Sequence, residues 1–134
     1  MKWLLDTNAC IHILNGTSAP VIARFRERSP RQLAICAVVK AELLYGARKS
    51  RRVADNLARL ERFFAPLSSL PFDEACAAEY GLLRADLAAR GTPIGSNDLM
   101  IAAIARVHDL IVVTNNSDEF ARVVGLRVED WETS

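Results

Sequence analysis

Apolar residues occur in two arrangements along the chain, and each arrangement predicts a different element. Short, wholly apolar runs predict buried strands at 3–5, 33–36 and 110–113, with further short strands near 67–70 and 126–128. Apolar residues spaced three or four apart predict helices over about 9–15, 20–28, 38–49, 53–64, 73–90, 97–108 and 118–123. Strands that alternate with helices in this way indicate an α/β fold, with helices packed on a central, mainly parallel sheet.

Polar residues mark the expected starts of several of these helices. Asn8 is suited to cap a helix that begins at Ala9, and Ser96 to cap one that begins at Asn97. Asp73 can start the helix after the third strand. We find no linker or repeat, so residues 1–134 are expected to form a single domain.

Acids and amides interrupt the pattern at places where apolar residues are expected. Asp6 follows the first strand, Asn115 and Asn116 follow the run 110–113, Glu42 lies inside an apolar helix, and Asp98 lies in the first turn of another. Ligands of parallel sheets bind at the carboxyl ends of the strands. We therefore expect these side chains to converge at one edge of the sheet.

The residue types at this edge favour a hard divalent cation. Mg²⁺ and Mn²⁺ prefer carboxylate, amide and water oxygens, and a cation relieves the repulsion among crowded carboxylates. A bound cation lowers the pKa of a coordinated water and stabilises charge on a phosphoryl oxygen. The pattern is therefore typical of a phosphodiester hydrolase.

Each of these residues also has a purely structural interpretation. Asp6 could cap the helix that follows it, and Asp98 could stabilise the positive end of its own helix. Glu42 could pair with Lys40 or Arg48, and Asn116 could be an ordinary turn residue. Only their joint placement favours a shared site.

Composition narrows the class of protein further. The formal net charge is +1, so nucleic acid could be held only by local basic clusters, at 24–31 and 48–52. The cysteines Cys10, Cys36 and Cys76 lack the spacing of a zinc site or a disulfide framework, which fits a reducing cytoplasm. The sequence shows no signal peptide and no apolar run long enough to span a membrane.

Five sequence blocks, in the same order, resemble the PIN-domain ribonucleases, and more closely the VapC toxins of bacterial toxin–antitoxin pairs. They are Leu5-Asp6-Thr7-Asn8, Glu42-Leu43-Leu44-Tyr45-Gly46-Ala47, residues 93–103, Val112-Val113-Thr114-Asn115-Asn116 followed by Glu119-Phe120, and Glu129-Asp130-Trp131. The resemblance spans essentially the whole chain. It implies a PIN-like α/β/α sandwich and a metal-dependent endoribonuclease.

The resemblance also implies roles for particular residues. Asp6, Glu42 and Asp98 would bind Mg²⁺ or Mn²⁺, with Thr7, Asn8 and Thr114 close by. A fourth acid is often found where this chain has Asn116, which offers a carbonyl oxygen but no charge. Glu119 or Asp118 could supply that charge through a water, so Asn116 and Glu119 complete the predicted catalytic set.

The partners implied by the resemblance are an RNA substrate, a VapB-type antitoxin and a second copy of the chain. Initiator tRNA is the substrate of close relatives, which makes tRNA the leading substrate class. The homodimer would form through the early helices and the helix at 53–64. The antitoxin tail would cross the acidic site, often with an Arg placed among the carboxylates.

Two other classes of protein share part of this pattern. An inactive RNA- or protein-binding module with the same fold would explain Asn116. A phospho-receiver or dehalogenase-like phosphatase also has an acid after its first strand. That class needs a second acid next to the first or two residues on, whereas Thr7 and Asn8 occupy those positions here.

Overall fold

The computed structural model describes residues 1–133, and its centre is a five-stranded sheet with the order β3-β2-β1-β4-β5. The strands are β1 (Trp3–Leu5), β2 (Leu33–Cys36), β3 (Ser68–Leu70), β4 (Ile111–Val113) and β5 (Arg127–Glu129). Each neighbouring pair of strands is parallel. The predicted parallel α/β architecture is therefore confirmed. Ser134, the last residue of the predicted domain, lies outside the described residues.

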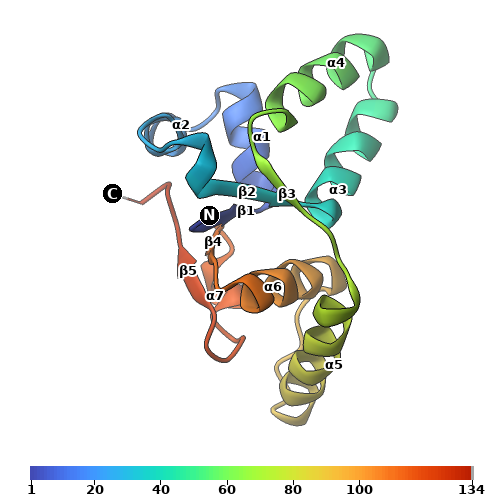
Figure 1. Ribbon diagram of the computed structural model, residues 1–134, viewed down its shortest axis with the longest axis vertical. Helices are drawn as coiled ribbons and strands as arrows, with labels where there is room; N and C mark the ends of the chain where they lie inside the picture. The colour runs from blue at the N-terminus through green and yellow to red at the C-terminus, as the bar shows by residue number, and fades with distance from the viewer. Residues whose placement is uncertain (134) are drawn as a thin grey trace.

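Helices cover both faces of this sheet, which makes the fold an α/β/α sandwich. They are α1 (Thr7–Asn15), α2 (Ala19–Arg26), α3 (Ala37–Arg48), α4 (Val53–Phe64), α5 (Glu74–Ala89), α6 (Ser96–His108) and α7 (Ser117–Phe120). In Figure 1, α1 to α4 lie above the strands, and α5, α6 and α7 lie below them. Helices α3 and α4 form a hairpin that projects from the upper side.

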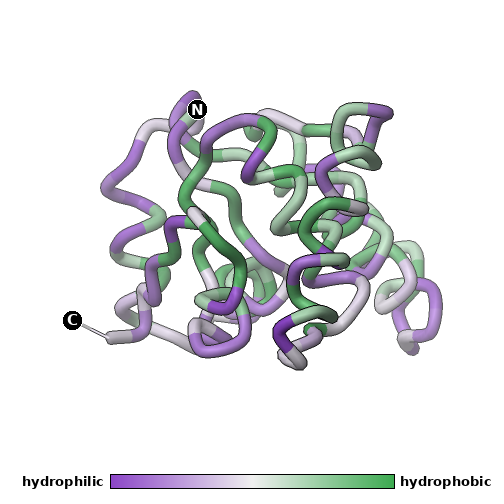
Figure 2. Tube along the Cα trace, turned by 90° about the horizontal axis from the view of Figure 1, so that it is seen from below, coloured by the Kyte–Doolittle hydropathy of each residue, from purple (hydrophilic) through white to green (hydrophobic). Residues whose placement is uncertain are grey.

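The core lies between the sheet and these helices. Leu4, Ile35 and Val112, from the three central strands, have no exposed surface. Helix α6 is buried over five successive residues, Ile101 to Ala105, because it lies between the sheet and α5. The small alanine side chains of α6 allow the sheet and α5 to pack closely against it. In Figure 2, hydrophobic stretches of the chain are concentrated in the interior, and many of the hydrophilic stretches lie at the periphery. Within residues 1–133, no helix is both long and apolar enough to span a bilayer.

The strand order creates a switch point between β1 and β4. The chain moves outward from β1 through β2 to β3, then returns to the other side of β1 for β4 and β5. In such sheets the connections leave the strands in opposite directions at the switch point, which opens a crevice at the carboxyl ends. Asp6 follows β1 and Thr114 follows β4, so both lie at this crevice.

The starts of α1 and α6 and the end of α7 differ from prediction in ways that affect this edge of the sheet, and the other element ends lie within about two residues of the predicted ones. Helix α1 begins at Thr7, and its N-cap is Asp6 rather than Asn8, because the Asp6 carboxylate accepts a hydrogen bond from Ala9 N at 2.8 Å. Helix α6 begins at Ser96 and follows Gly95, with no side-chain cap, so the predicted cap at Ser96 is wrong. Helix α7 ends at Phe120 instead of 123.

Candidate active site

The Asp6 carboxylate both caps a helix and belongs to the acidic site. Only 4% of the residue is exposed, and its side chain caps α1 through Ala9 N and is hydrogen-bonded to Thr114. Burial raises the pKa of Asp6 above its usual value, and the negative charge of Glu42 raises it further. The cap fixes the direction of this carboxylate, and its burial makes a positive partner favourable.

Glu42 lies in the middle of α3 and is partly buried. Its Oε1 accepts a hydrogen bond of 2.9 Å from the Thr7 hydroxyl, which ties α3 to the start of α1. Among the described ion pairs, none joins Glu42 to Lys40 or Arg48. The structure thus orients Glu42 toward the residue that follows Asp6.

Asp98 occupies the first turn of α6, as predicted. Its pKa is raised to about 6, first by burial and then by the charges of Glu119, Asp6 and Glu42. The charges that most affect the pKa of Asp98 are thus all negative. Asp98 therefore experiences the combined field of the other predicted acids, which means that the four carboxylates share one region of the molecule.

Glu119 and Asn116 form a pair at the start of α7. Asn116 Nδ2 donates a hydrogen bond of 2.6 Å to Glu119 Oε2, and Gly95 N donates one of 2.8 Å to Glu119 Oε1. These two donors lower the pKa of Glu119, the Gly95 amide most, and Glu119 also shares a hydrogen bond with Asp98. Asn116 is therefore bonded directly to Glu119, whereas Asp118 is exposed.

The donor set at this edge suits a hard cation, although the carboxylates are not gathered into a closed ligand set. Asp6, Glu42 and Asp98 supply oxygen ligands, and mutual repulsion contributes to the raised pKa values of Asp6 and Asp98. Across residues 1–133, no three His, Cys, Asp or Glu side chains are close enough together to hold a metal ion. A three-ligand metal site therefore stays a prediction.

Two hydroxyls and one backbone amide organise the acids. Thr114 is buried, and its hydroxyl oxygen accepts a hydrogen bond of 2.9 Å from Asn116 N while its side chain is also bonded to Asp6. Thr7 supports Glu42 in the same way. Both threonines were predicted to be neighbours of the site, whereas the Gly95 amide was not. A backbone donor leaves no mark on the sequence unless its turn is recognised.

Other candidate residues serve the structure. His12 is partly buried, and it contacts Thr17 Oγ1 at 2.8 Å and Glu132 at 3.0 Å. In the first basic cluster, Arg24 donates to the Asp130 carbonyl, and Arg28 stacks on Trp3 and Trp131. The Arg28 guanidinium is therefore occupied within the protein.

The raised pKa of Asp98 predicts how stability changes with pH. Because the folded protein holds this proton to about pH 6 and an unfolded Asp only to about 3.9, folding stability falls as pH rises between these values. We expect Asp98→Asn to be more stable than the parent by about 1–2 kcal/mol at pH 7.5, after allowing for partial exposure, and nearly equal to it at pH 4. Urea unfolding in EDTA measures both values, and an equal difference at the two pH values would contradict the assignment.

Comparison with known proteins agrees with the fold and the residue pattern. The PIN domain family model matches residues 3–126, and the chain therefore belongs to the PIN domain family. The tRNA(fMet)-specific endonuclease VapC of Shigella flexneri is 45% identical over 131 residues, which cover 98% of each chain. Ribonuclease VapC2 of Haemophilus influenzae is 38% identical over 131 residues, which again cover 98% of each chain.

Similar solved structures also come from VapBC complexes. VapBC from Salmonella typhimurium, bound to DNA, contains a chain with a TM-score of 0.91 and 42% identity, with 98% of each chain covered. VapBC2 from Rickettsia felis, bound to a promoter fragment, gives a TM-score of 0.89 and 34% identity, with 98% of this chain and 99% of the other covered. Within the PIN family, these similarities place the chain among the VapC ribonucleases of toxin–antitoxin systems.

Proposed function

We propose that residues 1–134 form one nuclease domain that cleaves RNA phosphodiester bonds with the help of Mg²⁺ or Mn²⁺. The observation that carries this proposal is the field at Asp98, which combines the negative charges of Glu119, Asp6 and Glu42 at the carboxyl edge of the sheet. Four acids kept together in a folded protein are costly unless they bind a cation or take part in chemistry. By the resemblance, the products carry a 5′-phosphate and a 3′-hydroxyl.

In this mechanism each residue has a separate task. Asp6, Glu42 and Asp98 would hold the cation, which when bound supplies charge stabilisation at the phosphoryl oxygen and acidifies a water. Thr7 and Thr114 orient Glu42 and Asp6. Glu119, fixed by Gly95 N and Asn116, is placed to accept a proton or orient a water beside Asp98.

Transfer RNA is the proposed substrate class, because a relative of 45% identity is named for tRNA(fMet). The second basic cluster, at 48–52, lies at the tip of the α3–α4 hairpin and offers phosphate contacts. The three free cysteines are buried, which agrees with a reducing cytoplasm. We further propose a homodimer formed through the early helices and α4.

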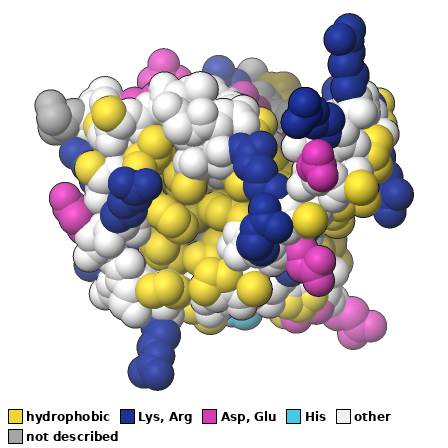
Figure 3. Space-filling view, turned by 90° about the horizontal axis from the view of Figure 1, so that it is seen from above, with side chains coloured by type: hydrophobic (Ala, Val, Ile, Leu, Met, Phe, Trp, Pro, Cys, Tyr) yellow, Lys and Arg dark blue, Asp and Glu magenta, His cyan; other side chains and the backbone are white. Residues whose placement is uncertain are grey.

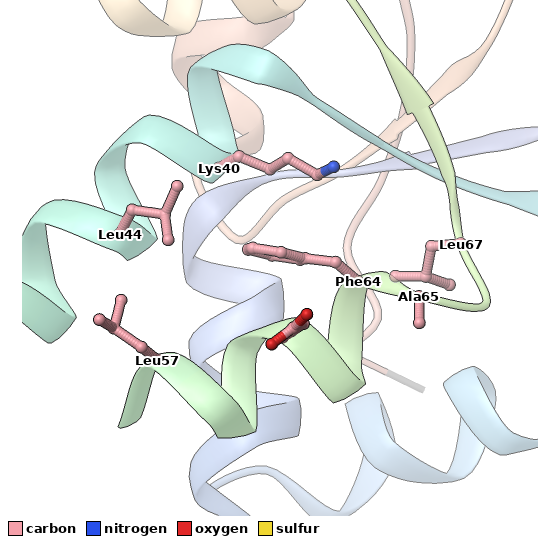
Figure 4. A pocket seen from close by; sticks show the side chains of 7 residues that line it. Lys40, Leu44, Leu57, Phe64, Ala65 and Leu67 are labelled. Atoms are coloured by element: carbon pink, nitrogen blue, oxygen red, sulfur yellow. The ribbon is translucent and has the colours of Figure 1, made fainter. Parts of the chain in front are cut away.

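The proposed protein partner is a VapB-type antitoxin, because the similar solved structures are VapBC complexes. An apolar groove of about 630 Å³ opens between α3 and α4 (Figure 4), lined by Lys40, Leu44, Leu57, Glu61, Phe64, Ala65 and Leu67. Figure 3 shows that hydrophobic side chains also gather in a hollow beside Lys and Arg on the face seen from above. Grooves lined by apolar side chains are a common place for a partner helix or segment to bind.

Metal removal tests the enzymatic proposal directly. Purified protein incubated with total tRNA and Mg²⁺ is expected to give discrete fragments on a denaturing gel, and excess EDTA is expected to abolish them. Restoring Mg²⁺ should restore cleavage. If the protein binds tRNA but leaves it intact under all these conditions, the chain is the inactive binding module instead.

A further inference from the structure

A second, smaller cavity adjoins the candidate active site. It has a volume of about 250 Å³ and lies between α1, α3 and α4, so we call it the α1–α3–α4 pocket. Its lining residues are Thr7, Ile11, Leu14, Asn15, Glu42, Leu43, Gly46, Ala47, Asn56, Arg59 and Leu60. Thr7 and Glu42 are hydrogen-bonded to each other and belong to the acidic site. The pocket is therefore continuous with the proposed place of cleavage.

The pocket combines apolar walls with amide side chains that have bonding capacity to spare. Asn15 Oδ1 accepts a hydrogen bond of 3.1 Å from Arg59, so the Asn15 NH₂ group remains for another partner. Asn56 Nδ2 donates one of 2.9 Å to Ser50, so the Asn56 carbonyl oxygen remains. The lining thus carries an amide donor and an amide acceptor as well as apolar surface.

Arg59 is held in place at this pocket. Its guanidinium donates to the Leu14 carbonyl and to Asn15, which joins α4 to the end of α1. A fixed guanidinium plane can stack on an aromatic ring, as it does on extruded bases in RNA complexes. Since the side chain is already ordered, little conformational entropy is lost when a ligand binds.

We propose that the α1–α3–α4 pocket binds one unpaired nucleobase of the RNA, close to the phosphate that lies at the acids. This inference rests on the proposed nuclease function and adds a specificity subsite to it. A base has two apolar faces and an edge of donors and acceptors, which matches the lining. The cavity is also smaller than the sites that enclose drug-sized ligands, so it suits a single ring system rather than a peptide segment.

Gly46 provides a way to fill this pocket without changing the acids. It lies in α3 and lines the cavity, and a Cβ added there would meet no atom within 4 Å. Gly81 is a matched control, because it lies inside α5, is exposed, and also has open space around an added Cβ. Both sites accept Leu as a good helix former.

The experiment compares the binding of two fluorescein-labelled RNA octamers, one carrying uracil bases and one abasic throughout. Both are measured by fluorescence anisotropy with Mg²⁺ in an Asp98→Asn background, in which cleavage is expected to be at least about a hundredfold slower. The background protein is expected to bind the base-carrying octamer about tenfold more tightly than the abasic one. Adding Gly46→Leu should abolish this ratio, whereas adding Gly81→Leu should leave it unchanged.

A second variant guards against misfolding of Gly46→Leu. Gly46→Ala should raise the melting temperature, because Ala replaces Gly within a helix, and should still lower the ratio two- to threefold. An unchanged ratio in both Gly46 variants would overturn the subsite. The subsite would also be overturned if the Gly46 variants weakened only the binding of the VapB-type partner. That result would assign the pocket to a protein contact.

The outcome is separable from the fate of the nuclease proposal. If the protein cleaves tRNA but the background protein binds both octamers equally, the subsite is wrong and the nuclease stands. If the protein never cleaves RNA but Gly46→Leu removes a tenfold preference for bases, the subsite stands and the nuclease is wrong.

Discussion

Asp98→Asn is expected to lower the rate of RNA cleavage at least about a hundredfold while the protein remains folded. Loss of groups that merely support a metal ligand already costs about 10- to 100-fold, and Asp98 is proposed to be a ligand itself. Asn keeps the size of the side chain and removes the charge. The raised pKa of Asp98 shows that its charge is costly in the folded protein, so losing the charge does not destabilise the fold.

Initial rates of tRNA cleavage at saturating Mg²⁺ measure this effect. Asp55→Asn is the matched control, because Asp55 is an exposed acid in the first turn of another helix, α4. It should cleave at the parent rate. Asp6→Asn should lose cleavage activity to a similar degree as Asp98→Asn. It should still fold, because Asn is as good an N-cap as Asp. Parent-like cleavage by Asp98→Asn would remove Asp98 from the metal site.

Trp131→Ala is expected to cause the largest loss of stability, about 3–5 kcal/mol, because a large buried ring is lost near the end of the chain. Only 1% of Trp131 is exposed, and its ring meets Trp3 edge-on at 6.1 Å between centroids. Arg28 lies 4.4 Å from the Trp3 centroid and 4.6 Å from that of Trp131. Glu129 Oε1 accepts hydrogen bonds from both indoles, at 3.1 and 3.0 Å.

Urea unfolding at pH 7.5 measures the loss, and the melting temperature should fall by on the order of 10 °C. Trp131→Phe is the control. It keeps an aromatic ring for Trp3 and Arg28 and loses one hydrogen bond, so it should cost far less than Ala. If Phe costs as much as Ala, the ring contacts with Trp3 and Arg28 that Phe retains do not stabilise the end of the chain.

Much of the fold follows from the local pattern. The apolar runs predicted the strands to within about one residue at each end, because residues buried on both faces of a parallel sheet need no alternation. Helix ends were less certain. Asp6 and Asn8 are both good caps, and only the fold decides which one reaches a free amide.

For the candidate site too, the sequence could name several residues but could not give their environment. Asp6, Glu42 and Asp98 could be named from residue type and placement, because carboxylates are conspicuous in apolar surroundings, whereas Glu119 was implied by the resemblance to PIN-domain ribonucleases. Their mutual field, and the pKa of about 6 at Asp98, depend on elements that are far apart in the sequence. The sequence left Glu119 and Asp118 as alternatives, because the Gly95 amide that donates a hydrogen bond to Glu119 comes from a turn far away in the sequence.

The sequence by itself determined the α/β class, the strands and the identity of the acids, since hydrophobic periodicity and charge are properties of each residue and its near neighbours. Tertiary structure alone decided the strand order β3-β2-β1-β4-β5, the approach of Asn116 and Gly95 to Glu119, and the pocket beside Glu42. These features arise from packing between elements that are far apart in the sequence. Such contacts depend on how whole faces pack, which local spacing does not specify.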